Sequence, residues 1–218
     1  REFDFITDSA RVHNGEWDKQ GEPLAQKTFY TSFVAHFKYS IPWEETLYYQ
    51  EKVQEIEAYS RTHSINGFKA RLQKYDRIFQ QIDQKGYQTQ KELFTHTEDP
   101  ILTERGVLLL SNRANIRHEI AVHIGRNGDF LLCDGRHRFS MVKILEIESV
   151  PARIVVRHEE WQQLRNEVAR VIENVEPAIK GTEELRAHIK TKLEEELKPV
   201  RSGIDHPDLK RIIERRTE

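Results

Sequence analysis

Three basic side chains follow a glycine in the stretch 130–145, which reads FLLCDGRHRFSMVKIL. An apolar strand is expected to end at Gly135 and a helix to begin, so Arg136, His137 and Arg138 fall in the first helical turn. The positive end of a helix dipole favours acidic groups at that place. Basic groups there run against this preference and indicate a partner that carries negative charge.

Phosphate groups are the partner that these residue types suit best. Exposed N–H groups at a helix start bind anions, and Gly135 lets a phosphate approach the main chain closely. Arg136 and Arg138 offer planar donors to phosphate oxygens, and His137 can donate a hydrogen bond or move a proton near neutral pH. Asp134 either caps the turn or holds a magnesium ion. In the structural alternative, Asp134 is an ordinary cap and the two arginines are solvated or paired with acidic neighbours.

The composition makes any basic site a local feature. The chain has 218 residues, enough for one substantial domain with attachments or for two small ones. With 34 Lys and Arg against 36 Asp and Glu, the net charge of -2 provides no general attraction for nucleic acid or for an anionic membrane. Cys133 is the only cysteine, which excludes an intramolecular disulfide and a multi-cysteine metal site. A reducing compartment, the cytoplasm, is expected.

Neither a membrane partner nor a second catalytic motif is expected. Apolar runs such as residues 107–110 are far shorter than the roughly 20 residues that cross a bilayer, and the first ten residues do not resemble a secretory signal. The sequence contains no GxxxxGK[ST], GxGxxG after a strand, HExxH, GxSxG or paired CxxC. The turn at 134–138 therefore has no competitor elsewhere.

Helical signals dominate the first half of the chain. Residues 27–37 predict a short strand or helix, and Ser40 and Pro42 predict the start of a helix over about 42–61. Apolar side chains at three- and four-residue steps predict a further helix from Asn66 to Gly86. The segment TQKELF predicts a short helical turn.

Strand signals surround the basic turn. HEIAVHIG predicts a strand with a packed His118 and an exposed His123 on opposite faces. Because the two side chains point to different sides of the sheet, we do not expect them to bind one metal ion together. Asn127-Gly128 predicts a hairpin to a second strand, DFLLC. Phe139, Val142 and Leu145 are expected to face the sheet from the helix after the turn.

A third strand over about 150–157 and a helix containing a packed Trp161 complete this region. Arg157 and His158, at the end of that strand, are secondary candidates for the same cleft. From about residue 176 the sequence is helical, and its apolar stripe either packs on its own domain or forms a homodimer contact. The stripe consists of Leu185, Ile189, Leu193 and Leu197.

These signals predict an α/β (α+β) fold, with a small mixed sheet flanked by helices. Three consecutive segments are expected. Residues 1–69 form an irregular and helical N-terminal region, residues 70–175 the core, and residues 176–218 a helical C-terminal extension.

Residues 119–158 resemble the core of the ParB/sulfiredoxin superfamily, with a strand, a glycine-and-arginine turn, a helix, a short link and a further strand. Residues 77–90, RIFQQIDQKGYQTQ, are similar to the helix that precedes this core in ParB proteins. The turn separates the chemistries of the superfamily. Sulfiredoxins have a GCHR-like turn with a reactive cysteine, for which this chain has Arg136, so sulfiredoxin activity is not expected and Cys133 is expected to be a small buried residue. Partitioning ParB proteins have a GERR-like turn that binds CTP.

The turn DGRHR differs at one place from the DGHHR of the free-serine kinases of this superfamily. That resemblance implies a nucleotide-binding, Mg2+-dependent transferase, a kinase that phosphorylates a small hydroxylated molecule with ATP or another nucleotide. Asp134 would act near the metal or the acceptor hydroxyl. Gly135 and the helix start would hold the phosphates, and His137 and Arg138 would stabilise the transferring charge.

In the serine kinases an early glutamate orients the acceptor hydroxyl. Glu16 and Asp18, in GEWD, are the candidates here, and the alternative is a surface loop with Trp17 packed in the core. The second functional hypothesis is a nucleotide-gated, DNA-binding protein of the partitioning type. It requires a basic helix pair in residues 159–218, which the neutral tail does not provide. A nuclease-like member, the third hypothesis, would need a carboxylate cluster that is not evident.

Overall fold

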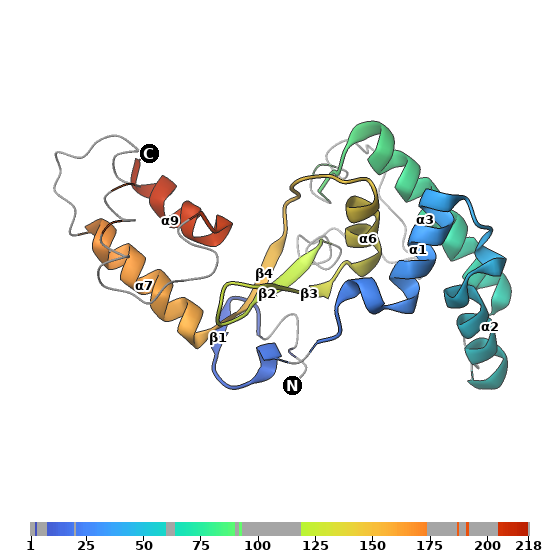
Figure 1. The fold of residues 1–218 in the computed structure, drawn as a ribbon, viewed down its shortest axis with the longest axis horizontal. Coiled ribbons are helices and arrows are strands. Elements are labelled where there is room, and N and C mark those ends of the chain that lie inside the picture. Colours follow the sequence, from blue (N-terminus) through green and yellow to red (C-terminus); the bar gives the residue numbers. More distant parts are fainter. Residues whose placement is uncertain are drawn as a thin grey trace, which may run out of the picture. The chain divides into compact units, whose positions relative to one another are not determined.

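The computed structural model describes residues 3, 8–19, 21–59, 64–89, 92, 119–173, 187, 191 and 205–217. By its internal contacts the chain divides into two compact units (Figure 1). Unit 1 consists of residues 1–20, 122–131 and 154–218, and unit 2 consists of residues 21–121 and 132–153. The units interleave along the chain, whereas the segments predicted from the sequence are consecutive.

A four-stranded mixed sheet runs in the order β1-β4-β2-β3 (Figure 1). Its strands are β1 (Arg11–His13), β2 (Ala121–Ile124), β3 (Phe130–Asp134) and β4 (Arg153–His158). β1 pairs in parallel with β4, with Val12 opposite Arg157. Between β2 and β3 the Gly125 N–H donates to the Asp129 carbonyl and Gly128 has φ 87°, so the predicted hairpin is confirmed.

Two helices pack together in unit 1: α7 (Glu159–Glu173) and α9 (Pro207–Thr217). Trp161, predicted to be packed, is fully buried. It belongs to a core cluster with Ile124, Val168, Ile172 and Leu209. The start of α9 is fixed by Asp208, whose buried carboxylate accepts hydrogen bonds from Arg157 and from the Trp161 indole and pairs with Arg165.

Unit 2 contains four described helices, and the residues that begin and end α3 can be identified in the sequence. They are α1 (Thr28–Tyr39), α2 (Leu47–Tyr59), α3 (Ile65–Lys85) and α6 (Arg136–Ile144). The Ser64 hydroxyl caps α3 by accepting from the Gly67 N–H at 3.0 Å, and Gly86 ends it with φ 75°. α1 covers almost all of residues 27–37, so this segment is a helix, which is one of the two predicted alternatives.

The prediction of one helix over 42–61 is wrong at its start. Trp43–Glu45 form a single 3-10 turn, and Thr46 then adopts an extended conformation. The Thr46 hydroxyl accepts a hydrogen bond from the Tyr49 N–H at 3.3 Å, which is the bond of a helix cap. Thr46 therefore begins α2 as a separate helix.

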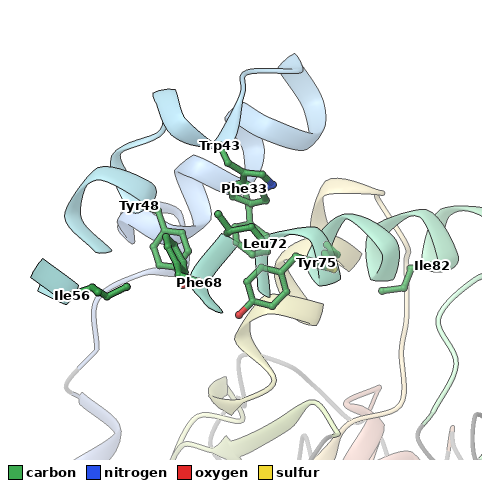
Figure 2. Close-up of a cluster of buried hydrophobic side chains, with 9 residues drawn as sticks. Phe33, Trp43, Tyr48, Ile56, Phe68, Leu72, Tyr75 and Ile82 are labelled. Carbon is green, nitrogen blue, oxygen red and sulfur yellow. The ribbon is translucent and has the colours of Figure 1, made fainter. Parts of the chain in front are cut away.

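Aromatic side chains form the core of unit 2 (Figure 2). Phe33 is fully buried and contacts the rings of Trp43, at 5.2 Å between centroids, and Tyr75, at 5.5 Å. Met141 brings α6 into this cluster, and α6 packs against both α1 and α3. In Figure 2 the Tyr75 hydroxyl points away from Phe33 and Trp43.

The fold class is confirmed: six described helices and a four-strand mixed sheet, with helices before and after the sheet. Two side-chain predictions are wrong. Leu145 packs on the aromatic cluster of unit 2 instead of the sheet. His123 is half-buried, because the rings of Phe3 and Trp17 cover it at 5.3 and 5.7 Å. His118, most of TQKELF and the stripe from Leu185 to Leu197 lie outside the described residues.

Among the described helices, none combines the length and the apolar character needed to span a bilayer.

Gly135 is required by two separate features of its position. Its φ of 76° lies in the left-handed region, which residues with a Cβ rarely adopt. A Cβ built at this position would also lie 2.8 Å from the Cα of Ile120 and 3.1 Å from the Glu119 carbonyl oxygen. Both neighbours are backbone atoms, which cannot rotate away as a flexible side chain would. The backbone of residues 119–120 therefore fixes where α6 begins.

Three alanine variants separate these two features. Gly135→Ala should lower the free energy of unfolding by about 3 kcal/mol or more, because backbone strain and a steric clash add together. Gly86→Ala has nothing within 4 Å, but its backbone at φ 75° and ψ 174° also favours glycine, so strain alone should cost about 1–3 kcal/mol there. Gly21→Ala, in open space without a positive φ, should be nearly neutral. Urea unfolding measures all three, and equal losses at Gly135 and Gly86 would contradict the close approach.

Candidate functional site

The first turn of α6 presents backbone donors without a side-chain cap. Gly135 occupies the cap position, no acidic residue lies in the first turn, and the first helical bond runs from the Phe139 N–H to the Gly135 carbonyl. The exposed Asp134 accepts from the Gly135 N–H at 2.7 Å, so it orders the turn but does not cap the helix. The second carboxylate oxygen of Asp134 makes no hydrogen bond among the described residues, and magnesium binding by this carboxylate stays a prediction.

Arg136 and Arg138 are held by aromatic residues. The exposed Arg136 guanidinium lies 5.0 Å from the centre of the Phe29 ring, which is a cation–π distance. Arg138 Nη1 lies 3.5 Å from the Tyr87 hydroxyl, which donates to Glu119 at 3.2 Å. Across the described part of the chain, neither arginine forms an ion pair with a carboxylate. The described residues therefore do not show the alternative in which these arginines pair with acidic neighbours.

His137 is a neutral part of the aromatic core. Its ring stacks on Tyr75, with centroids 4.6 Å apart, and on Phe33, at 5.7 Å. Burial, with Arg136 and Arg71 nearby, lowers the pKa of His137 to about 4. The imidazole is therefore uncharged at pH 7 and can donate one N–H, but this environment does not support the predicted proton transfer near neutral pH or the stabilisation of charge by an imidazolium.

A pocket of about 320 Å³ adjoins Arg136. Phe29 and Tyr48 supply its aromatic wall, and the rest of the lining is charged or polar: Glu22, Gln26, Lys27, Thr28, Glu51, Lys52 and Glu55. Lys27 pairs with Glu22 at 2.6 Å and Lys52 with Glu55 at 2.5 Å. These pairs leave one cation and one anion of the lining unpaired within the described structure, Arg136 and Glu51.

Glu16 and Asp18 belong to unit 1, whereas the turn belongs to unit 2. The Asp18 carboxylate is almost fully enclosed and accepts from the Arg126 guanidinium, at 2.7 Å for Nη2, and from the Arg126 backbone N–H at 2.8 Å. Glu16 pairs with Lys19 and Arg126 at the exposed edge of the same loop. These contacts account for both carboxylates without a substrate, and their role toward an acceptor hydroxyl stays a prediction.

Other candidates are engaged in contacts within their own unit. Arg157 pairs with Asp208 at 2.7 Å, and the buried His158 bonds through Nε2 to the Gly15 carbonyl at 2.9 Å. The Cys133 residue is exposed on β3 rather than part of the core, contrary to the prediction that it is buried. Its thiol is nevertheless partly shielded from water, and this desolvation together with the neighbouring Asp134 raises the pKa of the thiol to about 11, so the thiol is protonated at neutral pH.

Sequence reasoning missed the residues that surround the turn. Phe29, Tyr48, Glu51 and Arg71 come from helices distant in sequence, and no motif links them to residues 134–138. The only available signal was the density of aromatic residues in FYTSF and LYY, which also suits an ordinary core.

The Asp18 contact predicts a dependence of stability on pH. Arg126 hydrogen bonds outweigh burial and lower the pKa of Asp18 from 3.8 to about 2. A lowered folded-state pKa means that the stabilisation is complete above about pH 4 and disappears as the pH falls toward 2. We expect a loss of about 2 kcal/mol over that interval, measured by urea unfolding. In Asp18→Asn this component should be absent, and an unchanged pH profile in that variant would contradict the assignment.

Comparison of the chain with protein-family models, with curated proteins and with solved structures gives no match.

Proposed function

We propose that the turn at residues 134–138 binds the phosphates of a nucleotide and that the protein is a phosphotransferase acting on a small hydroxylated molecule. The observation that supports this most is the state of Arg136 and Arg138. Both lie in the first turn of α6, held by Phe29 and Tyr87, without a carboxylate partner in the described structure. Unpaired planar donors beside uncapped backbone N–H groups suit a polyphosphate.

In this proposal each group of the turn has a separate task. The N–H groups at the start of α6 bind phosphate oxygens, and Gly135 leaves room for them on the solvent side. Arg136 and Arg138 neutralise the charge that builds up on the transferring group. His137 holds the helix start against the aromatic core and can donate a single N–H.

Magnesium fits this site through a small number of protein oxygens. The ion commonly binds one or two carboxylates together with substrate phosphates and water. Asp134 is exposed beside the turn and would supply such an oxygen. When bound, the ion would neutralise phosphate charge.

The pocket beside Arg136 is the place for the acceptor. Its volume of about 320 Å³ suits a small molecule, and Glu51 is a carboxylate on its wall without an ion pair in the described structure. Glu51 would accept the proton of the acceptor hydroxyl. The hydroxyl oxygen of the acceptor would bond to the terminal phosphorus as the bond between that phosphorus and the leaving nucleoside diphosphate breaks.

Removing either arginine should weaken nucleotide binding without unfolding the protein. We expect Arg136→Ala and Arg138→Ala each to raise the dissociation constant for ATP by about 10- to 100-fold, because each loses a charge-assisted pair. Lys143→Ala is the matched control, since this exposed cation lies in the last turn of the same helix. Calorimetric titration measures the three variants. Equal affinity in all of them and in the wild type would reject the assignment.

Turnover distinguishes a transferase from a nucleotide-binding protein. With ATP, ADP or CTP and Mg2+, nucleotide consumption should rise when pools of small alcohols, amino acids or sugars are added. Glu51→Gln should lower that stimulated rate by about 100-fold or more while nucleotide affinity stays unchanged. Stimulation by DNA alone would instead support the nucleotide-gated DNA-binding hypothesis and overturn the transferase.

A further inference from the structure

Arg71 is a further arginine of unit 2 that has no carboxylate partner among the described residues. It lies on α3 four residues before Tyr75, so the two side chains share one face of the helix. The guanidinium lies 5.2 Å from the centre of the Phe68 ring. Within the described part of the chain it forms no ion pair, and its Nε is buried without a hydrogen-bond acceptor.

A ring stack joins the helices that carry Arg71 and Arg136. Tyr75 of α3 and His137 of α6 stack at 4.6 Å, Arg71 lies one turn from Tyr75, and Arg136 directly precedes His137. The pKa shifts agree with this placement: the charge of each arginine helps lower the pKa of His137 and opposes the rise that burial causes in the pKa of Tyr75. Two positive groups from different helices therefore flank one pair of stacked rings.

Three arginines of unit 1 differ from Arg71 and Arg136 in their partners. Arg126 is paired with Asp18, and both Arg157 and Arg165 are paired with Asp208. Arg71 and Arg136 instead rest on the faces of Phe68 and Phe29. Like charges that converge without a counter-ion repel each other, and an anion bound between them would relieve that repulsion.

We infer that Arg71 is a phosphate-binding residue that acts together with Arg136 on a diphosphate group. This inference rests on the proposed function and adds to it a residue from a different helix. The ligand chemistry is two linked phosphates, which either inorganic pyrophosphate or the diphosphate of a nucleotide supplies. In a nucleotide bound at the start of α6, two planar guanidinium groups from different helices can each bind a different phosphate of the linked pair.

Titration of the full chain with pyrophosphate and with ADP, followed by calorimetry, tests the inference. Arg71→Gln should weaken binding of both ligands by about 10- to 100-fold, because a charge-assisted bidentate contact is lost. Arg77→Gln is the matched control: it removes the same charge from an exposed position six residues along α3, on another side of the helix. Its affinity for both ligands should stay within about two-fold of the wild type.

The outcomes separate this inference from the proposed function. If the wild type binds both ligands, Arg136→Ala weakens binding and Arg71→Gln does not, Arg71 is excluded and the nucleotide site survives. If the wild type binds neither ligand, both proposals fall. Loss of ADP binding with unchanged pyrophosphate binding would show that Arg71 recognises another part of the nucleotide, which also overturns the inference.

A second measurement keeps the inference testable without any ligand. In the free protein Arg71→Gln should raise the pKa of His137, followed by NMR titration of the imidazole, because a nearby positive charge is removed. An unchanged His137 pKa would contradict the placement of Arg71 beside the ring stack. If Arg71→Gln does not fold, Arg71→Lys retains the charge but not the planar fork, and it should still weaken pyrophosphate binding by about five-fold or more.

Discussion

The position at which α6 begins is set by a close contact between two stretches of backbone, which leaves no room for a side chain at Gly135. Gly135 brings its own backbone against that of residues 119–120, at a distance that excludes a Cβ, and it adopts a left-handed conformation that favours glycine. The placement of the residues that follow Gly135 depends on this position. It directs the first N–H groups of the helix outward, sets Arg136 over Phe29, and sends His137 into the aromatic core. The fold therefore requires Gly135 whether or not a phosphate binds, and the proposal of a ligand rests on Arg136 and Arg138.

Aromatic rings hold two arginines of unit 2, Arg136 and Arg71, in the way that carboxylates hold Arg126, Arg157 and Arg165 of unit 1. A carboxylate partner neutralises a guanidinium and holds it in place, as Asp18 does for Arg126. A ring fixes the position of the guanidinium but leaves its charge and its outward donors available. Phe29 and Phe68 therefore keep Arg136 and Arg71 ordered and still able to bind an anion. This difference between the units makes the turn a stronger candidate than its five-residue motif alone.

Local signals in the sequence predicted the hairpin, the end of α3 at Gly86 and the helix after Gly135, because each depends on a few neighbouring residues. The burial of His123 depends on its contacts with the rings of Phe3 and Trp17, which lie far away in the sequence. The alternation of residues along the strand could therefore not predict it. The same limit applied to the site. DGRHR identified the anion-binding turn as a hypothesis, but the uncharged state of His137 and the presence of Arg71 arise only when α3 packs on α6.

The parallel pairing of β1 with β4 joins segments that are far apart in the sequence, since Arg11 lies opposite Val156. A ribosome releases Arg11 long before Val156, so β1 has no β4 to pair with while most of unit 2 is synthesised. Unit 1 can close only after β4, α7 and α9 have followed. Fragments truncated after α6 would therefore lack the partner of β1 and the whole of α7 and α9, and would expose Ile124 to solvent or to aggregation.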